Sequence, residues 1–391
     1  MKIAVISFGN AGGKITDKLL WYEQESGRNL IASAISVNSA RVDLARLEHL
    51  PHDNQFLVGQ TDPRMKGHGV GGDPDLGAEI TEMDRHEIDR ALDAVPVFDI
   101  DAFLVVAGLG GGTGSGGAPR LAEEIRDRYE EPVYGLGILP STDEGSRAVL
   151  NAARSFRSFA EATNNLFLFD NNVWRGSGDT VESGYDRTNE EIAKRVVTLL
   201  GAGEIDGSPV SENAIDSSDI RRTLSNSGVS SIAYAEDERI PNTNPGLLGR
   251  FKSSGKNGLE ETDAAAKVNG LIRQAVQSRL TCPAGIGSAE RSLIVVSGPP
   301  DAISQKGIES ARQWLERRTG SVEVLSGDDP RPRANSLRAV VLLSNVTDVP
   351  PVDRLQELAV EAEENIEKHK ETRKREMEEL IRDEEDALDP V

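Results

Sequence analysis

The first half of the chain alternates short apolar runs with longer stretches of helical pattern. Nearly continuous apolar runs lie at Lys2–Ser7, Leu30–Val37, Ile100–Ala107, Val133–Leu139 and Leu166–Phe169. Strands that are buried on both faces show this pattern, and strands that alternate with helices form parallel sheets. The pattern therefore predicts an α/β fold, whose ligand binds beyond the carboxyl ends of the strands.

The stretches between these runs predict the helices that cover the sheet. We expect these helices at Lys14–Glu25, Asp75–Ala94, Pro119–Tyr129 and Gly145–Thr163. A further helix, Tyr185–Leu200, carries apolar residues at helical spacing on one face and leads out of the first half.

The second half predicts a smaller α/β unit. A Gly/Pro-rich loop and a short helix from Asp216 precede a polar stretch that extends to Gly258. The strands and helices expected after this stretch are Thr262–Arg279, Arg291–Ser297, Asp301–Arg317, Ser321–Leu325 and Ala339–Ser344.

The last segment, Val352–Ala387, is helical in pattern and dominated by Glu, Lys and Arg. We interpret it as a solvated helix with an acidic end; a dedicated binding tail is the alternative. The expected organisation is an N-terminal domain, a central connecting helix, a C-terminal domain and a charged end, at 1–180, 181–204, 205–350 and 351–391.

The chain is strongly acidic. Its 391 residues carry 65 Asp and Glu against 44 Lys and Arg, a formal net charge of −21. Nucleic acid is therefore not an expected partner, because its phosphates would be repelled. The acid is spread along the chain, which suits a high-salt cytoplasm where screening removes the repulsion; an ordinary acidic protein is the alternative. The apolar start is too short for a signal peptide, and the single Cys282 and scattered histidines form no disulfide or metal pattern.

A glycine-rich segment, GLGGGTGSGG at 108–117, directly follows an apolar run. Its seven glycines exceed what a tight turn needs. Bare backbone between a strand and a helix lets N–H groups approach an anion, so the segment predicts a phosphate-binding loop. An earlier segment, GNAGGKI at 9–15, is one residue short of a P-loop and also lacks the dinucleotide spacing, so neither familiar phosphate motif fits.

The 110–116 segment resembles the signature of the tubulin/FtsZ superfamily of polymerising GTPases. The segment GHGVGGDPDLG at 67–77 is similar, position by position, to the loop with which FtsZ senses the γ-phosphate, and 9–14 takes the place of the first phosphate loop. The resemblance covers about residues 1–350. It implies the tubulin/FtsZ fold, with a Rossmann-like parallel-sheet GTPase domain, a long central helix and a smaller C-terminal α/β domain.

Within the superfamily, the chain looks most like the archaeal CetZ group. Its end shows neither the long linker nor the apolar-proline peptide of division FtsZ, and it lacks the loop insertions of eukaryotic tubulin. The resemblance implies a cytoskeletal GTPase that controls cell shape or motility in a salt-loving archaeon, in the cytoplasm or at the inner face of the cell envelope. Unidentified membrane or cytoskeletal adaptors are expected as partners.

The resemblance implies GTP and GDP as ligands. Glu144 would contact the ribose and Asn171 the guanine, while Tyr185 would stack on the base one turn before Asn189. A core ring is the alternative for Tyr185. Arg147 is one residue short of the FtsZ spacing and is a possible contact. The remaining expected GTP-binding residues are Asn10, Ala11, Gly12, Gly13, Lys14, Gly71, Gly72, Gly110, Gly111, Gly112, Thr113 and Gly114.

The resemblance also implies that Asp216 and Asp219 are catalytic, although Asn213 is displaced by one residue from the FtsZ pattern. Asp216 is in addition a plausible helix N-cap. Head-to-tail stacking would bring the two carboxylates to the γ-phosphate of the next subunit, where they would position the attacking water. Such a contact does not close on itself, so it generates a filament, and hydrolysis would be stimulated by assembly.

Mg²⁺ is expected with the nucleotide, but no ligand is assigned, because Ser39 and Ala40 stand where FtsZ has an Asp. Three alternatives to a polymerising GTPase stay open. The protein could be an FtsZ-type division protein, or a nucleotide-binding tubulin homologue with little GTPase activity. A metabolic nucleotide-dependent enzyme would need a catalytic His or Lys near the glycine segments, and the sequence shows no such cluster.

Overall fold

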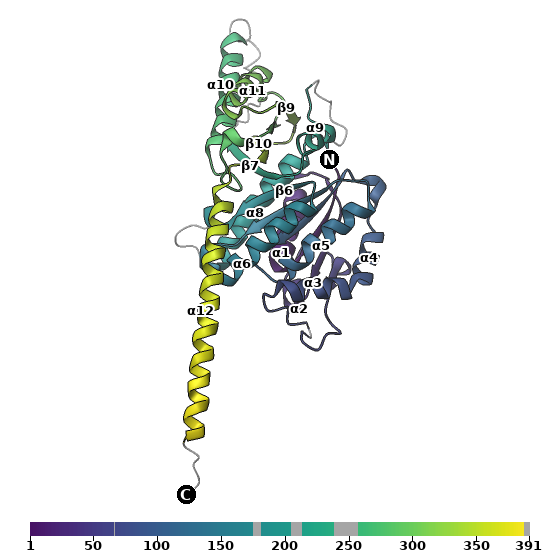
Figure 1. The fold of residues 1–391 in the computed structure, drawn as a ribbon. Helices are drawn as coiled ribbons and strands as arrows, with labels where there is room; N and C mark the ends of the chain where they lie inside the picture. Colours follow the sequence, from purple (N-terminus) through teal and green to yellow (C-terminus); the bar gives the residue numbers. More distant parts are fainter. Residues whose placement is uncertain (66, 175–180, 205–212, 238–256, 387–391) are drawn as a thin grey trace.

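A single ten-stranded sheet runs through the protein, in the order β3-β2-β1-β4-β5-β6-β7-β10-β8-β9 (Figure 1). The structure is a computed structural model that describes residues 1–65, 67–174, 181–204, 213–237 and 257–386. The predicted acidic end at 387–391, most of the Gly/Pro-rich loop and part of the polar stretch before Gly258 lie outside these residues.

The predicted parallel sheet of the first half is confirmed. Its five apolar runs all form strands that pair in parallel, and a short edge strand that the pattern did not predict joins them. These strands are β1 (Ile3–Phe8), β2 (Ile31–Asn38), β3 (Gln55–Leu57), β4 (Ala102–Gly108), β5 (Val133–Leu139) and β6 (Asn165–Asp170). Because they are parallel, their carboxyl ends meet at one edge of the sheet.

Helices cover both faces of this sheet, and neighbouring residues of β1 separate the two cores. Ile3 and Val5 belong to one buried cluster and Ala4 and Ile6 to the other, as expected when side chains alternate across a strand. The first cluster includes side chains of α1 (Gly9–Ser26) and α8 (Val181–Leu200). The second includes side chains of α3 (Pro74–Met83), α4 (Arg85–Asp93), α5 (Thr113–Arg128) and α6 (Ser146–Ala162).

Predicted helix boundaries next to the glycine segments are wrong at three places. The helix expected from Lys14 begins at Gly9, and the helix expected from Pro119 begins at Thr113. The helix expected over 75–94 is two helices, α3 and α4, that meet at Asp84. Glycine disfavours helix interiors, which is why propensity assigned the glycine segments to loops. Close packing of these helix starts against neighbouring backbone overrides that preference.

The second half extends the same sheet. It adds β7 (Val229–Asp237), β8 (Arg291–Gly298), β9 (Glu323–Pro330) and β10 (Leu337–Val346), with α10 (Asn257–Gln277) and α11 (Gln305–Thr319) beside them. β6 joins β7 in parallel through only two residue pairs, and β10 runs antiparallel to β7 and β8.

Strand β7 was not predicted, because serines place it within the polar stretch. Ser230 and Ser231 are fully buried, and both hydroxyls are hydrogen bonded. Ser230 Oγ donates to Asn165 Oδ1 at 2.6 Å, and Ser231 Oγ donates to the Cys282 carbonyl at 2.7 Å. Partners on other elements therefore make these polar residues compatible with a central strand, which local sequence does not reveal.

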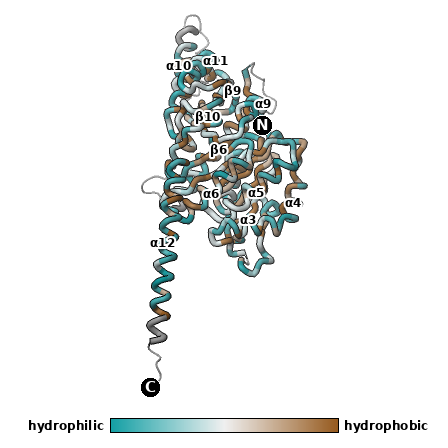
Figure 2. The backbone as a smooth tube through the Cα atoms, viewed as in Figure 1, coloured by the Kyte–Doolittle hydropathy of each residue, from teal (hydrophilic) through white to brown (hydrophobic). Residues whose placement is uncertain are grey.

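The last helix, α12 (Pro350–Asp386), packs beside α6 with its first half and then leaves the body. In Figure 1 it continues past the end of the molecule that holds α2 (Arg41–Leu44) and α3. The tube in Figure 2 is mostly hydrophilic along this projecting part. In the ranges that the structure describes, none of the helices is both long and apolar enough to cross a membrane.

Candidate functional site

Three glycine segments meet at the carboxyl ends of β1 and β4. Gly9 has a φ of 71°, and a methyl group on it would lie 3.1 Å from the Gly114 nitrogen. A methyl group on Gly112 would lie 2.7 Å from the Asp73 nitrogen. The 9–14, 67–77 and 108–117 segments therefore approach one another closely through their backbones, which leaves no room for a side chain at Gly9 or Gly112.

The first of these segments is the opening turn of α1 and not a loop. Asn10 and Ala11 are exposed, Lys14 is half-buried, and Gly12 and Gly13 are buried. A methyl group on Gly12 would lie 2.4 Å from the Val106 carbonyl oxygen, so this glycine lets α1 approach β4. Asn10 and Lys14 are thus presented from a helix start, where backbone N–H groups have no partner within the helix.

Helices α1 and α5 both begin at this edge of the sheet. Among the described residues, no side chain caps either start, whereas Asp73 caps α3 and Asp216 caps α9 (Ser217–Thr223). The uncapped N–H groups and the positive end of each helix dipole favour an anion. Gly110–Thr113 and Gly114 stand at the start of α5, so the predicted phosphate site has the right local geometry.

A buried side chain that the sequence did not single out joins two glycine segments. Asn151, on α6, donates from Nδ2 to the Gly72 carbonyl at 2.9 Å and to the Gly110 carbonyl at 3.1 Å. Gly71 and Gly72 both have positive φ, at 60° and 75°. The sequence shows no clear signal for it, because its neighbours one turn away on α6, Arg147 and Ser155, are polar as well. Asn151 fixes the predicted γ-phosphate segment against the 108–117 segment.

Two further side chains border the same cluster. The hydroxyls of Ser39 and Thr113 are buried and lie 2.6 Å apart, which ties the turn after β2 to the start of α5. The Gly69 nitrogen also donates to the Ser39 carbonyl at 3.2 Å.

Arg147 lies beside Gly72, because a methyl group on Gly72 would be 3.7 Å from the arginine Nε. The position of Arg147 is therefore compatible with the contact that its spacing left open.

The predicted ribose and stacking residues touch one another. Tyr185, half-buried at the start of α8, donates its hydroxyl to Glu144 Oε1 at 3.0 Å. The same carboxylate oxygen accepts from the Ser141 nitrogen at 2.8 Å, which fixes Glu144 after β5. Asn189 is half-buried one turn further along α8. The partial exposure of Tyr185 does not suit a core ring, because a core position would be fully buried.

Asn171 is buried directly after β6, at the start of α7 (Asn171–Trp174). Its neighbour Asp170 is also buried, and burial raises the pKa of this carboxyl above its usual range. The Asn172 nitrogen donates to Asp170 Oδ1 at 3.0 Å. The residue predicted to read the base therefore follows a strand whose end is held by hydrogen bonds.

The predicted catalytic carboxylates form a capping box on α9. Asp216 Oδ1 accepts from the Ser218 and Asp219 nitrogens at 2.8 and 3.1 Å, and Asp219 Oδ2 accepts from the Asp216 nitrogen at 3.2 Å. The predicted N-cap is thus confirmed. Asp216 is exposed and Asp219 half-buried. The capping bonds hold both side chains at the surface in fixed orientations.

The carboxylates and the glycine segments lie at opposite ends of the molecule (Figure 1). The glycine segments follow the end of β1, whereas the start of β1 lies at the end of α8, where the Met1 ammonium donates to the Leu200 carbonyl at 2.7 Å. Helix α8, with 20 residues, spans about 30 Å between these ends. Within one chain, Asp216 and Asp219 are therefore far from the predicted phosphate site.

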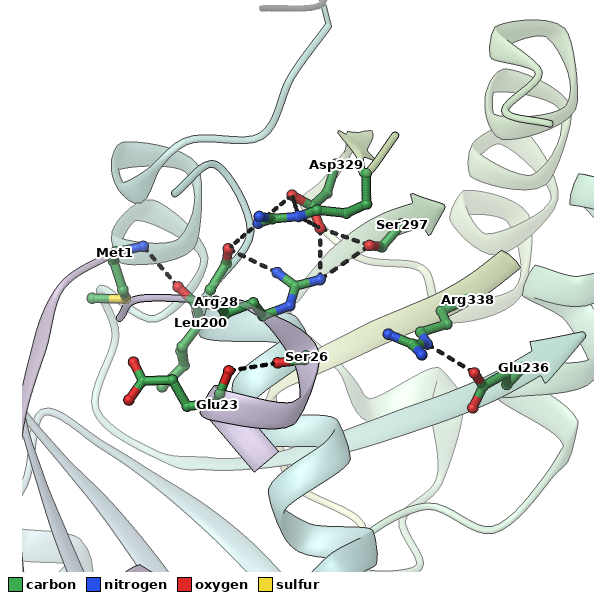
Figure 3. A network of polar contacts seen from close by, with 11 residues as sticks. Met1, Glu23, Ser26, Arg28, Leu200, Glu236, Ser297, Asp329 and Arg338 are labelled. Atoms are coloured by element: carbon green, nitrogen blue, oxygen red, sulfur yellow. Dashed lines mark hydrogen bonds and ion pairs between the residues drawn. The ribbon is translucent and has the colours of Figure 1, made fainter. Parts of the chain in front are cut away.

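A buried ion-pair network joins the two halves at the carboxylate end (Figure 3). Arg28, beyond the end of α1, contacts Asp329 Oδ2 at 2.7 Å and donates to the Gly201 carbonyl at 2.8 Å. Burial alone raises the pKa of Asp329, but Arg28 and Arg331 hold its pKa below the usual range. The network thus stabilises the ionised carboxylate inside the protein.

This network also supports β9, the strand that pairs with the predicted catalytic segment. Asp328, next to Asp329 on β9, donates from its nitrogen to the Asn213 carbonyl at 3.1 Å and accepts from the Ile215 nitrogen at 3.2 Å. Asn213 is therefore fixed through its backbone, just before Asp216. Asn213, which lies one residue away from the position of the FtsZ pattern, is thus in contact with β9.

In the described ranges, no group of three or more His, Cys, Asp or Glu side chains is placed so that it could bind a metal ion.

Comparisons with known proteins agree with this architecture. Residues 2–179 match the family model described as Tubulin/FtsZ family, GTPase domain, and residues 178–361 match Tubulin-like CetZ, C-terminal domain. The tubulin-like protein CetZ1 of Haloferax volcanii is 49% identical over 372 residues, which cover 94% of each chain.

Solved structures give the same relationship. A GDP-bound monomer of CetZ1 from Haloferax volcanii superposes with a TM-score of 0.81 at 46% identity, covering 93% of this chain and 100% of that one. A GTPγS-bound protofilament of CetZ2 from the same organism has a TM-score of 0.81 at 37% identity, covering 94% and 100%. The predicted resemblance is confirmed, and the chain belongs to the CetZ group of tubulin-like proteins in the tubulin/FtsZ family.

Proposed function

We propose that this protein binds and hydrolyses GTP, and that it polymerises head to tail so that each active site forms between two subunits. The observation that carries the proposal is the placement of the glycine segments and of Asp216 and Asp219 at opposite ends of one chain. A relative solved as a GTPγS-bound protofilament supports it. Asp216 and Asp219 of one subunit would reach the γ-phosphate that the next subunit holds.

In this proposal the backbone binds the phosphates. The uncapped starts of α1 and α5 and the N–H groups of Gly71 and Gly72 would surround them. Glu144 would exchange its bond with Tyr185 for the ribose hydroxyls, while Asn171 and Asn189 would hydrogen-bond the guanine, since an amide both donates and accepts. Asp216 and Asp219 would orient the attacking water in line with the γ-phosphate.

Mg²⁺ is part of the same proposal. The hydroxyls of Ser39 and Thr113 lie among the glycine segments, and they fit an ion that keeps several waters and phosphate oxygens as ligands. When bound, the ion would neutralise charge on the phosphates. Ser39 and Thr113 themselves close the turn after β2 onto α5.

The GTPase rate in concentrated KCl, measured against protein concentration, tests the proposal. Because one site needs two subunits, the rate per subunit should rise steeply with concentration, and Asp219→Asn should lower it by about 10²-fold or more without weakening GTP binding. Asp127→Asn is the matched control, because Asp127 is an exposed carboxylate on α5 that is neither a predicted GTP contact nor part of the capping box. A rate per subunit that is independent of concentration would contradict the shared site.

A second function, nucleotide-dependent association with little turnover, has one observation in its favour. Both carboxylates already accept backbone hydrogen bonds in the capping box, which leaves fewer lone pairs for a water. Polymer formation with GTP but without phosphate release would support this reading. In either case we propose a cytoplasmic filament, at the inner face of the cell envelope, that acts in cell shape or motility.

A further inference from the structure

Helix α12 carries one apolar stripe, of which only the first half is covered. Val352, Leu355, Ala359 and Ala362 are buried where α12 lies against α6. The Arg154–Glu363 ion pair, at 3.1 Å, is the last contact of this kind that joins the two helices in the described residues. Beyond it the helix is exposed as far as Ile381, apart from the half-buried Ile366.

The stripe continues along the exposed half. At helical spacing, Met377, Leu380 and Ile381 fall on the same face as Val352 and Leu355. They are 53%, 63% and 54% exposed, which places them among the most exposed large apolar side chains of the described residues. A solvated helix has no need of three clustered apolar residues in a segment otherwise built from Glu, Lys and Arg. The stripe therefore indicates a partner.

The direction of α12 indicates which partner. Figure 1 shows α12 running along one side of the body and past the end that holds α2 and α3, where the glycine segments lie. From Glu363 to Ile381 it extends by about 27 Å. In the head-to-tail filament proposed above, on which this inference rests, the next subunit occupies that space. Because α10 and α12 lie along the same side of the body, the next subunit would present its α10 to the exposed half of α12.

Basic side chains of α12 can pair with acidic side chains of α10. Between its covered and exposed apolar residues, α12 carries Lys370, Arg373 and Lys374, interspersed with glutamates. The exposed start of α10 carries Glu261 and Asp263. Ala266 is exposed on the same start, and its small side chain allows another helix to approach closely.

We propose that the exposed half of α12 docks on α10 of the adjacent subunit in the filament, with the stripe of Met377, Leu380 and Ile381 against the exposed start of α10 around Ala266. This contact adds to the end-to-end interface and does not involve the nucleotide. Salt screens the charged pairs but not the apolar stripe, so docking would persist in a high-salt cytoplasm.

The test compares polymer assembly by full-length variants, sedimented with GTPγS in concentrated KCl. The triple variant Met377→Gln, Leu380→Gln, Ile381→Gln should raise the critical concentration by about tenfold, because it loses the buried apolar area. Val360→Gln is the matched control, since Val360 is 60% exposed on another face of α12. Both variants should bind GTPγS as the wild type does, because no nucleotide contact is changed.

Oxidation of a second variant, Met377→Cys with Ala266→Cys, identifies the docking surface. Cross-links between subunits that appear only with polymer, and that require both substitutions, are expected. Cross-linking of Met377→Cys alone would show that two copies of α12 pair with each other. Binding to anionic lipid vesicles that depends on the stripe, without any change in assembly, would show that the stripe binds a membrane. Either result would overturn the proposal. If the wild type forms no polymer, the proposed function itself is wrong. If the wild type polymerises and the triple variant polymerises equally well, only the docking proposal is wrong.

Discussion

The two ends of the molecule are built by opposite means. At the glycine end, backbone approaches backbone, and a methyl group on Gly116 would lie 2.0 Å from the Pro74 carbonyl oxygen. At the carboxylate end, charged side chains are used: Asp216 and Asp219 cap α9 at the surface, and Arg28 and Asp329 pair beneath it. The first end is therefore sensitive to an atom added at its close contacts, such as Gly116, and the second to the loss of a buried charge.

This difference suits the two halves of the site that we propose to form between subunits. A cradle for phosphates needs many N–H groups at fixed positions, which only bare backbone provides. The half that acts on a water needs ionised oxygens, which must stay in solvent until a neighbour covers them.

The largest effect on stability is expected at the carboxylate end, from Arg28→Met. Asp329 would lose its closest charged partner while it stays buried, and breaking a buried ion pair lowers the free energy of unfolding by about 3–5 kcal/mol. Urea unfolding at pH 7 measures this change. The double variant Arg28→Met with Asp329→Leu is the control, and it should recover part of the loss because no buried carboxylate remains without Arg28, although Arg331 loses its ion pair with Asp329.

The same pair gives a pH dependence with a defined sign. The pKa of Asp329 is lower in the folded protein than its ordinary value, which is near 3.9. Its ionisation therefore stabilises the fold above that ordinary pKa, and the stabilisation is lost as the pH falls through the lowered value. An acid titration in which the wild type and the Asp329→Asn variant lose stability in parallel would contradict this assignment.

A smaller effect is expected at the glycine end, from Gly116→Ala. The new methyl group would meet the Pro74 carbonyl and the Ala78 nitrogen, so α3 and α5 must separate. Overpacking of this kind costs about 1–3 kcal/mol. Nucleotide affinity, measured by calorimetry, should fall with it. Gly270→Ala is the control, because nothing lies within 4 Å of the added methyl on α10, and it should be neutral or slightly stabilising.

The smallest effect on stability is expected from Asp216→Asn, which separates capping from charge. Asn caps a helix about as well as Asp, so the free energy of unfolding should change by only a few tenths of a kcal/mol, whereas Asp216→Ala should lower it by about 0.5–2 kcal/mol. Both variants should lose GTP turnover. Full turnover in Asp216→Asn would show that the charge of this residue has only a structural role.

Much of the architecture could be predicted from the sequence, because the apolar patterns that indicate strands and helices are local. The runs at β1, β4 and β5 are apolar on both faces, so they predict buried parallel strands wherever they occur. The polar strand β7 could not be predicted, because the hydrogen-bond partners of Ser230 and Ser231 are residues distant in the chain, such as Asn165 and Cys282. The helix starts at Gly9 and Thr113 escaped for a related reason, because glycine content predicts loops locally.

What the sequence determined by itself is the fold class and the family, through apolar period and glycine spacing. Only the tertiary structure decided that Asn151 joins two glycine segments, that Tyr185 meets Glu144, and that the carboxylates lie at the far end of α8. The physical reason is that these contacts join residues distant in the chain, whose meeting depends on strand order and helix length. The same holds for α12, whose covered and exposed halves follow a single helical pattern in the sequence.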